Sequence, residues 1–272
     1  MLKTLSPKEI INSEQRLKLK NNKYKCMKKN IQIIAITILL LGVGCQTKEN
    51  TQNINSSEKL LTAYFQSIGG YHNIKAIETK IVDGHYIEPG YNLLLKAHQE
   101  YKRPYYRIVG DTARGFAEGF DGKSWEYNKK KGYYRSKGEA AKATLRGAEF
   151  DESFIDYKEK GYEVEFKGIT VLENQEYYEL LLKYPEGDVK RYFFDKSNYL
   201  PRYMTKTMPL HAVGEPIDYI VSTTDYRKVG KVLFPFSKIE RNVHTGQMIN
   251  STLTDTIILN EDIPLSRFSP MK

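Results

Sequence analysis

The sequence has few of the residues from which metal and redox sites are built. Its 272 residues include only two cysteines, Cys26 and Cys45, and five histidines. Neither a His-Glu-x-x-His nor a Gly-x-Ser-x-Gly segment occurs, so nothing supports a zinc protease or a serine hydrolase of the usual kind. His98-Gln99-Glu100 has the spacing of the zinc deaminases but lacks their Pro-Cys-x-x-Cys segment. We therefore expect no metal, no cofactor and no catalysis.

An excess of positive charge is confined to the first part of the chain. The full sequence carries a net charge of +9. Residues 1–44 hold nine of the 42 Lys and Arg and two of the 33 Asp and Glu, which leaves 33 basic and 31 acidic residues for the remainder. Because the remainder is nearly neutral, it has no bulk charge with which to attract nucleic acid, and we expect no nucleic-acid partner.

Residues 27–44 have the pattern of a secretory signal peptide. Two lysines follow Met27, an almost unbroken apolar run covers residues 33–43, and small residues come next. The run is shorter than the roughly 20 residues that a helix needs to cross a bilayer. We expect Met27 to be the true start, so that residues 1–26 lie upstream of the protein.

Cys45 comes directly after Gly42-Val43-Gly44. This arrangement resembles the lipobox of bacterial lipoproteins, and the resemblance implies cleavage before Cys45 and lipidation of its thiol. An ordinary secretory signal with an incidental cysteine and an uncleaved anchor are the alternatives. Residues 45–57 contain no aromatic residue, and we expect them to form a flexible tether to a folded domain over residues 58–272.

The apolar periodicity of this domain predicts a mainly β structure with a few helices, of the α+β class. Leu60, Leu61 and Tyr64 recur at helical spacing and predict a helix over residues 57–68. A second amphipathic helix is predicted over residues 139–158. Between them and beyond, about eleven segments alternate apolar and polar residues between short turns, which indicates an antiparallel meander. A sheet of this length has to curl, and the two helices are available to cover its concave side.

Six short segments of turns and aromatic residues follow one another in a characteristic order. They are Gly119-Phe120-Asp121-Gly122 with Trp125, residues 149–157, Gly161-Tyr162-Glu163-Val164, residues 192–200, residues 225–230, and Phe234-Pro235. Their order and spacing resemble the LolA/LolB-like superfamily, and in particular proteins similar to outer membrane lipoprotein-sorting proteins. The resemblance implies an open (half) β-barrel covered by helices, with an apolar cavity that binds acyl chains or lipidated polypeptides without catalysis.

Apolar strand positions define the predicted cavity. Under the resemblance, the cavity lining consists of Leu93, Leu95, Val164, Phe166, Leu180, Leu182, Leu253 and Ile257. The alternative is that the same side chains form an ordinary core. The predicted helix over residues 139–158 supplies a lid, whose apolar residues are Leu145, Ala148, Phe150 and Phe154.

These patterns predict a lipoprotein of the cell envelope that binds acyl chains, lipids or lipidated proteins. We expect a monomer anchored through Cys45. Gln46 after the cysteine resembles outer-membrane lipoproteins, which favours the outer membrane facing the periplasm, with the cell surface as the alternative. Two other functions remain open. One is a protein-interaction or stress-sensing module on the same fold, and the other is an envelope hydrolase with an unrecognised pair of carboxylates.

Overall fold

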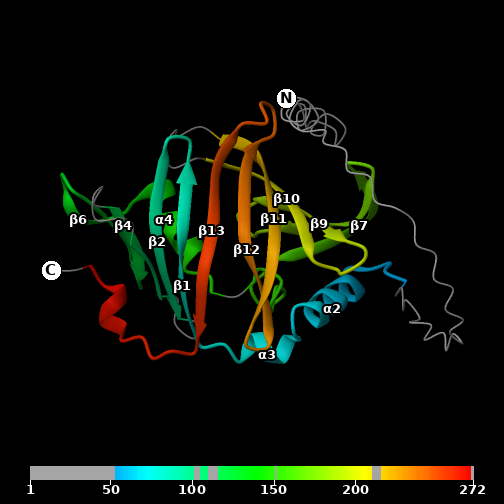
Figure 1. Ribbon diagram of the computed structural model, residues 1–272, viewed down its shortest axis with the longest axis horizontal. Coiled ribbons are helices and arrows are strands. Elements are labelled where there is room, and N and C mark those ends of the chain that lie inside the picture. Colours follow the sequence, from blue (N-terminus) through cyan, green and yellow to red (C-terminus); the bar gives the residue numbers. More distant parts are fainter. Residues whose placement is uncertain (1–52, 101–104, 110–115, 151, 210–215, 271–272) are drawn as a thin grey trace, which may run out of the picture.

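The protein contains one open antiparallel sheet (Figure 1). The computed structural model describes residues 53–100, 105–109, 116–150, 152–209 and 216–270, and thirteen strands lie in this part of the chain. Their order across the sheet is β6-β5-β4-β3-β2-β1-β13-β12-β11-β10-β9-β8-β7. The strands are β1 (Thr79–Glu88), β2 (Tyr91–Glu100), β3 (Tyr105–Val109), β4 (Phe116–Asp121), β5 (Ser124–Asn128), β6 (Gly132–Arg135), β7 (Glu163–Leu172), β8 (Gln175–Lys183), β9 (Val189–Asp195), β10 (Pro201–Pro209), β11 (Pro216–Val229), β12 (Val232–Asn242) and β13 (Met248–Leu259).

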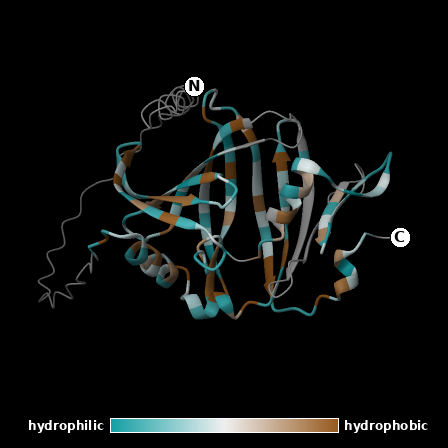
Figure 2. Cartoon of the chain, turned by 180° about the vertical axis from the view of Figure 1, so that it is seen from behind, coloured by the Kyte–Doolittle hydropathy of each residue, from teal (hydrophilic) through white to brown (hydrophobic). Residues whose placement is uncertain are grey.

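The order of the strands determines what covers the sheet. Strands that are consecutive in sequence pair with each other, except for β6 and β7, and β1 also pairs with β13. Because β6 and β7 lie at opposite edges, the chain between them has to cross from one edge to the other. This connection carries α4 (Gly138–Gly147), and Figure 2, seen from behind, shows α4 in front of the sheet. The predicted fold class, an open half-barrel covered by helices, is confirmed, although thirteen strands exceed the eleven expected.

Helix α2 (Ser57–Ser67) begins and ends as its sequence predicts. The Ser56 hydroxyl accepts a hydrogen bond from the backbone N–H of Lys59 at 3.3 Å, a typical N-cap. The helix ends before Gly69, which has a φ of +115°, and a Cβ at this glycine would lie 2.1 Å from the carbonyl oxygen of Lys231. Only glycine allows this backbone contact, which fixes the end of α2 against the β11–β12 turn. The short helix α3 (Tyr71–Lys75) follows.

The predicted helix over residues 139–158 is wrong beyond Gly147. Residues 153–161 form turns, and Asp156 has a left-handed φ of 49° that no α-helix accommodates. Two of the apolar residues that suggested a longer helix, Phe154 and Ile155, lie in this turn instead. Their side chains are buried in the main core. Side-chain contacts with α3, remote in sequence, hold the turn in place.

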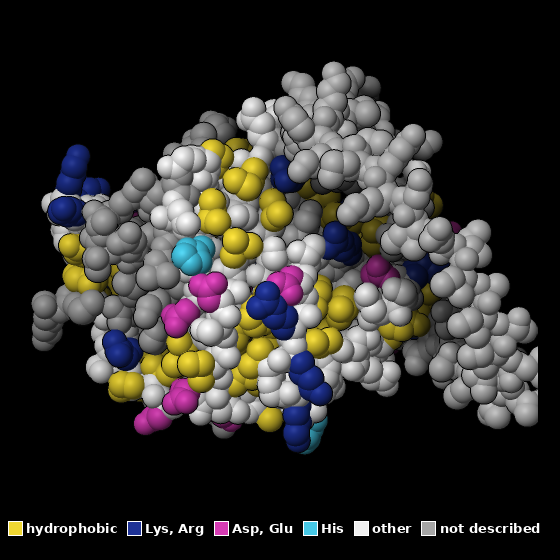
Figure 3. All heavy atoms as spheres, viewed as in Figure 1, with side chains coloured by type: hydrophobic (Ala, Val, Ile, Leu, Met, Phe, Trp, Pro, Cys, Tyr) yellow, Lys and Arg dark blue, Asp and Glu magenta, His cyan; other side chains and the backbone are white. Residues whose placement is uncertain are grey.

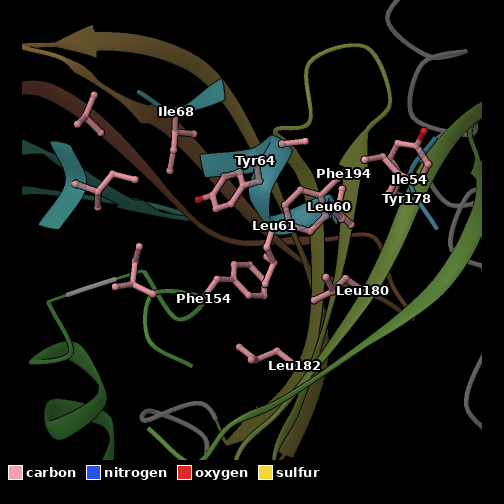
Figure 4. Packing of buried hydrophobic residues seen from close by; sticks show 14 of the residues in the cluster. Ile54, Leu60, Leu61, Tyr64, Ile68, Phe154, Tyr178, Leu180, Leu182 and Phe194 are labelled. Atoms are coloured by element: carbon pink, nitrogen blue, oxygen red, sulfur yellow. The ribbon is translucent and has the colours of Figure 1, made fainter. Parts of the chain in front are cut away.

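The main core lies between α2, the turn after α4, and strands β8 and β9. Figure 4 shows Leu60, Leu61 and Tyr64 of α2 close to Phe154 and to Phe194 of β9. The ring centroids of Tyr64 and Phe194 are 5.5 Å apart in an edge-to-face arrangement, which aromatic pairs favour. This cluster therefore ties α2 to the strands at the β7 edge of the sheet.

A smaller cluster lies at the other end of the sheet. Trp125 of β5 is buried, and its Nε1–H donates a hydrogen bond to the carbonyl oxygen of Phe268 at 2.7 Å. Phe268 ends the short 3-10 helix η1 (Leu265–Phe268) and is fully buried. Helix α4 packs on β4 and β5 nearby, where the Ser124 hydroxyl donates to the carbonyl oxygen of Ala141. The central strands lie between these two clusters.

Candidate functional site

A groove of about 490 Å³ lies on the inner face of the central strands. Its floor comes from β1 and from β9 to β13, and its wall includes Phe150, Glu152 and Ser153 of the connection that crosses the sheet. Ile74 of α3 and Ile77 line one end. Small-molecule sites are concave and typically measure about 300–1,000 Å³, so this groove has the size of a ligand site.

The character of the groove changes along β12. Six residues of this strand line it, namely Phe234, Pro235, Phe236, Ser237, Lys238 and Glu240. The neighbouring Leu233 N–H donates to the carbonyl oxygen of Ile68 at 2.8 Å, so Phe234 lies beside the end of α2. The groove therefore has Phe234 beside α2 and Lys238 and Glu240 farther along β12, while the charged residues Lys80 and Glu152 also line it.

A bulge decides which residues of β13 reach the groove. Thr254 pairs with Gly84, whereas Ile257 pairs with Val82, so β13 holds one extra residue between these pairs. Because directly opposed residues share a face, Thr254 and Ile257 both face inward despite their odd spacing. Leu253 points outward and is 40% exposed. Figure 3 shows the outer face, where hydrophobic side chains are scattered among charged ones.

Four of the predicted cavity residues belong to the main core instead of the groove wall. Leu180 and Leu182 of β8 are fully buried, and Val164 and Phe166 of β7 pack against the same cluster. They share the inner face with the groove, but α2 and the turn around Phe154 cover this end of the sheet. Leu180 and Leu182 therefore lie in the core, and Val164 and Phe166 are partly buried against it.

The other four predicted cavity residues fall in three places. Ile257 lines the groove, and Leu253 lies on the outer face. Leu93 and Leu95 lie on β2, but their side chains fall outside the described part of the structure. The bulge explains why Leu253 and Ile257, four residues apart, do not share a face as a regular strand would require.

The predicted lid residues also separate. Phe150 lines the groove, whereas Phe154 and Ala148 are buried. Leu145 of α4 is 52% exposed. The segment that borders the groove is therefore the irregular stretch after α4, not the helix itself.

The residues that sequence reasoning missed come from the central strands. They include Tyr192 of β9, Met204 of β10, Val221 of β11 and Phe236 of β12. Each lies on a strand that the alternation of apolar and polar residues predicts. The sequence therefore indicates which of these side chains share a face of their strand. What the sequence does not reveal is that the inner face stays uncovered here, because this depends on where the crossing connection packs.

Two polar clusters hold the stretch after α4 in place. Glu149 accepts hydrogen bonds from Lys160 Nζ at 2.9 Å and from the Tyr162 hydroxyl at 3.1 Å. Asp156 accepts from Lys75 Nζ at 2.7 Å and from the Tyr71 hydroxyl. Bonding to Lys75, and then to Tyr71, holds the pKa of Asp156 below its usual range, so this carboxylate is charged at neutral pH.

Neutral hydroxyl groups line the middle of the groove. Burial raises the pKa of the Tyr192 and Tyr226 phenols, so both keep their protons at neutral pH. The Tyr226 hydroxyl donates to the carbonyl oxygen of Pro201 at 2.9 Å. The Ser153 and Tyr184 hydroxyls lie 3.2 Å apart, and Lys190 Nζ donates to Tyr184 at 2.5 Å. The site therefore places neutral hydroxyl groups beside apolar side chains such as Met204 and Val221.

The described residues contain no cluster of three or more His, Cys, Asp or Glu side chains that could hold a metal ion. Within the same described part of the chain, no helix has both the length and the apolar character needed to cross a membrane.

Comparison with known proteins gives a likeness in structure only. No protein-family model matches the sequence, and no curated protein matches it. A domain from Vibrio parahaemolyticus, described as an outer membrane lipoprotein-sorting protein, aligns with a TM-score of 0.54 at 12% identity, over 77% of this chain and 94% of that one. A LolA superfamily protein from Nitrosomonas europaea aligns with a TM-score of 0.51 at 12% identity, over 79% and 98%.

A DUF1329 family protein from Desulfovibrio piger is similar to the same degree. It aligns with a TM-score of 0.57 at 10% identity, over 78% of this chain and 96% of that one. Each solved chain is covered almost completely, and more than three quarters of this chain is aligned in each case. At such low identity the likeness concerns the fold alone, and the protein shares its fold with these three structures, one of which is described as a LolA superfamily protein.

Proposed function

We propose that this protein is a lipid-anchored protein of the cell envelope that binds an acyl chain in the groove on its inner face. The observation that carries the proposal is the groove itself, a space of about 490 Å³ with Phe234, Phe236 and Ile257 on its floor. Burial of one methylene contributes about 0.8 kcal/mol, so a chain of moderate length needs only part of this floor to bind tightly. Binding of this kind needs no catalytic residue, in line with the expectation that the protein is not an enzyme.

The fold supports the proposal at a coarser level. One structure with this fold is described as an outer membrane lipoprotein-sorting protein domain, which links the fold to the envelope. The predicted signal peptide and lipidation of Cys45 would hold the domain near a membrane. The predicted tether over residues 45–57 is too long, because Ile54 is buried in the main core and Ser56 caps α2. The seven residues from Gln46 to Gln52 would span about 15 Å as a random coil. A groove held that close to a bilayer is placed to receive a lipid or a lipidated protein.

Lipid that copurifies with the protein tests the proposal. The full chain carrying Cys45→Ser cannot be lipidated at this residue, so native mass spectrometry would detect only non-covalently bound lipid. Thr254→Trp should displace this lipid, because Thr254 faces the groove opposite Gly84, which has no side chain. Leu253→Trp, on the outer face of the same strand, is the matched control and should retain it. Equal lipid content in both folded variants would contradict the proposal.

A second candidate function is a non-catalytic protein-interaction module that binds an extended peptide. Strand β7 favours it, because β7 is an edge of the sheet within the described residues and carries exposed Ile169 and Val171. Exposed apolar edge strands are suited to pairing with a strand from another chain. Replacing Ile169 with Lys should abolish such pairing and leave lipid binding unchanged, which separates the two functions.

A further inference from the structure

The two edges of the sheet are protected to different degrees. Within the described residues, these edges are β6 and β7, at opposite ends of the sheet (Figure 1). Strand β6 has only four residues, and its last residue, Arg135, forms an ion pair with Asp121 at 2.6 Å. Strand β7 has ten residues, and residues 168–172 include neither a charged residue nor a proline. Because short strands, charges and prolines are the usual means of keeping an edge from pairing with another chain, β7 is the edge that remains open to one.

A bulge in β7 determines which way its exposed apolar side chains face. Phe166 pairs with Leu180. Ile169 pairs with Tyr178, so β7 holds one extra residue between these two pairs. Leu180 and Tyr178 both belong to the main core, and directly opposed residues share a face, so Ile169 faces inward. Val171, two residues farther on, faces the same way. Ile169 and Val171 are nevertheless 53% and 56% exposed, the highest values for large apolar side chains among the described residues.

The exposed part of β7 is complementary to itself. A two-fold axis at Thr170 pairs two antiparallel copies of β7, with Ile169 of each copy opposite Val171 of the other. The four β-branched side chains then meet on one face, and such cross-strand packing stabilises a sheet. Moving the axis by one residue in either direction places Lys167 opposite Val171, or Glu173 opposite Ile169. The axis at Thr170 is therefore the one that matches apolar residues with apolar residues.

The charges on either side of this stretch favour the same register. With the axis at Thr170, Lys167 of one copy lies opposite Glu173 of the other, and no like charges are opposed over residues 167–173. Lys167 Nζ donates to Glu165 at 2.8 Å, and Glu173 accepts a hydrogen bond from the Tyr203 hydroxyl at 3.2 Å. The two copies can keep these bonds, so the opposite charges add a modest attraction to groups that already have partners.

We propose that the β7 edge binds the β7 edge of a second copy of this chain, in the antiparallel register centred on Thr170. A contact between two single strands is smaller than the roughly 1,200 Å² of a stable interface, so the dimer is weak and its population depends on concentration. Lipidation of Cys45 would confine the copies to one membrane surface and raise their effective concentration. This inference replaces the monomer expected from the sequence. It does not depend on the acyl-binding groove, and it names a partner for the edge that the second candidate function uses.

Disulfide cross-linking tests the register. In the full chain carrying Cys26→Ser/Cys45→Ser, an added Ile169→Cys or Val171→Cys provides the only thiol. The two proteins are mixed and oxidised, and peptide mass spectrometry distinguishes mixed linkages from identical ones. Directly opposed Cβ atoms lie about 4.5–5.5 Å apart, whereas diagonal neighbours lie about 7–8 Å apart, too far for a relaxed disulfide. We therefore expect mixed linkages to exceed each identical linkage by roughly tenfold, compared with about twofold for random collisions.

A mixture of Leu253→Cys and Ile258→Cys proteins is the matched control, because both residues are exposed on β13, a strand with neighbours on both sides. This mixture should give only the random ratio. Analytical ultracentrifugation of the parent with both natural cysteines replaced provides a test without added thiols. Its dimer fraction should rise with concentration. Val171→Lys should remove the dimer, whereas Val189→Lys, at an exposed position on the interior strand β9, should retain it.

The outcomes decide both the partner and the register. A random ratio of linkages, or a dimer that survives Val171→Lys, would overturn the inference. Mostly identical linkages would overturn the register. A dimer that forms only when residues 46–52 are deleted would assign the edge to this chain's own N-terminal segment, and another polypeptide that copurifies with the parent but not with Val171→Lys would assign it to a different protein. Val171→Lys should bind lipid as the parent does, so a failure of the acyl-binding groove is detected separately.

Discussion

The two ends of the sheet are stabilised in different ways. At the β7 end, α2 and the turn around Phe154 bury a large cluster that includes Tyr64, Leu180 and Phe194. At the β6 end, α4 and η1 cover short strands around a single Trp125. Neither set of covering elements fills the space over the central strands. The groove is the part of the inner face that lies between two covered ends, and an intact β7 end is needed to hold its wall in place.

The largest expected effect of a substitution is at the β7 end. Leu180→Ala should lower the free energy of unfolding by about 3 kcal/mol, because the side chain is fully buried and its removal leaves a cavity. Chemical denaturation measures this change. Ile169→Ala on β7 removes a 53% exposed side chain of the same sheet and should cost less than about 0.5 kcal/mol. Similar losses in both variants would show that the Leu180 cluster is not a packed core.

A smaller and more local effect is expected at the β6 end. Trp125→Phe removes the indole N–H and leaves the buried carbonyl group of Phe268 without this donor, at a cost of about 1–3 kcal/mol. Hydrogen exchange should accelerate in residues 265–268 more than in β8. Lipid binding should stay at the level of the parent protein. Loss of lipid binding in a folded variant would show that the two ends of the sheet are not independent.

The smallest effect is expected where the crossing connection meets α3. Asp156→Asn replaces the carboxylate that binds Lys75 and Tyr71, and should cost about 1 kcal/mol at neutral pH for a partly exposed pair. Because the folded pKa of Asp156 lies below its unfolded value, its contribution is present above about pH 4 and is lost as the pH falls further. The parent should therefore lose more stability than the variant on acidification. Asp225→Asn, at an exposed pair with Arg227, is the control and should have less effect.

The sequence predicted the fold better than the groove. Alternating residues such as those of β7 and β12 indicate strands without any tertiary information, and Ser56 with Gly69 marks the ends of α2. The length of the second helix was not predictable, since the left-handed turn at Asp156 depends on contacts with Lys75, 81 residues away in sequence. The spacing of apolar residues indicates whether a segment is a helix or a strand. It carries no information about contacts between residues that are distant in sequence.

The groove residues were hard to predict for a related reason. The bulge in β13 places Leu253 and Ile257 on opposite faces of the sheet. No residue of this strand predicts the bulge from the sequence. Leu180 and Ile257 have the same apolar character, yet one lies in the core and the other lines the groove. What separates them is the path of the connection between β6 and β7, which is a property of the whole fold.

The most direct test of the acyl-binding groove is photo-crosslinking with a fatty acid that carries a diazirine on its chain. After irradiation of the full chain carrying Cys45→Ser, peptide mass spectrometry identifies the labelled residues. The account predicts labels on the inner face of the central strands, at Phe236, Thr254 and Ile257. Labels concentrated instead at Leu253 and Ile258, which are exposed on β13, would contradict it.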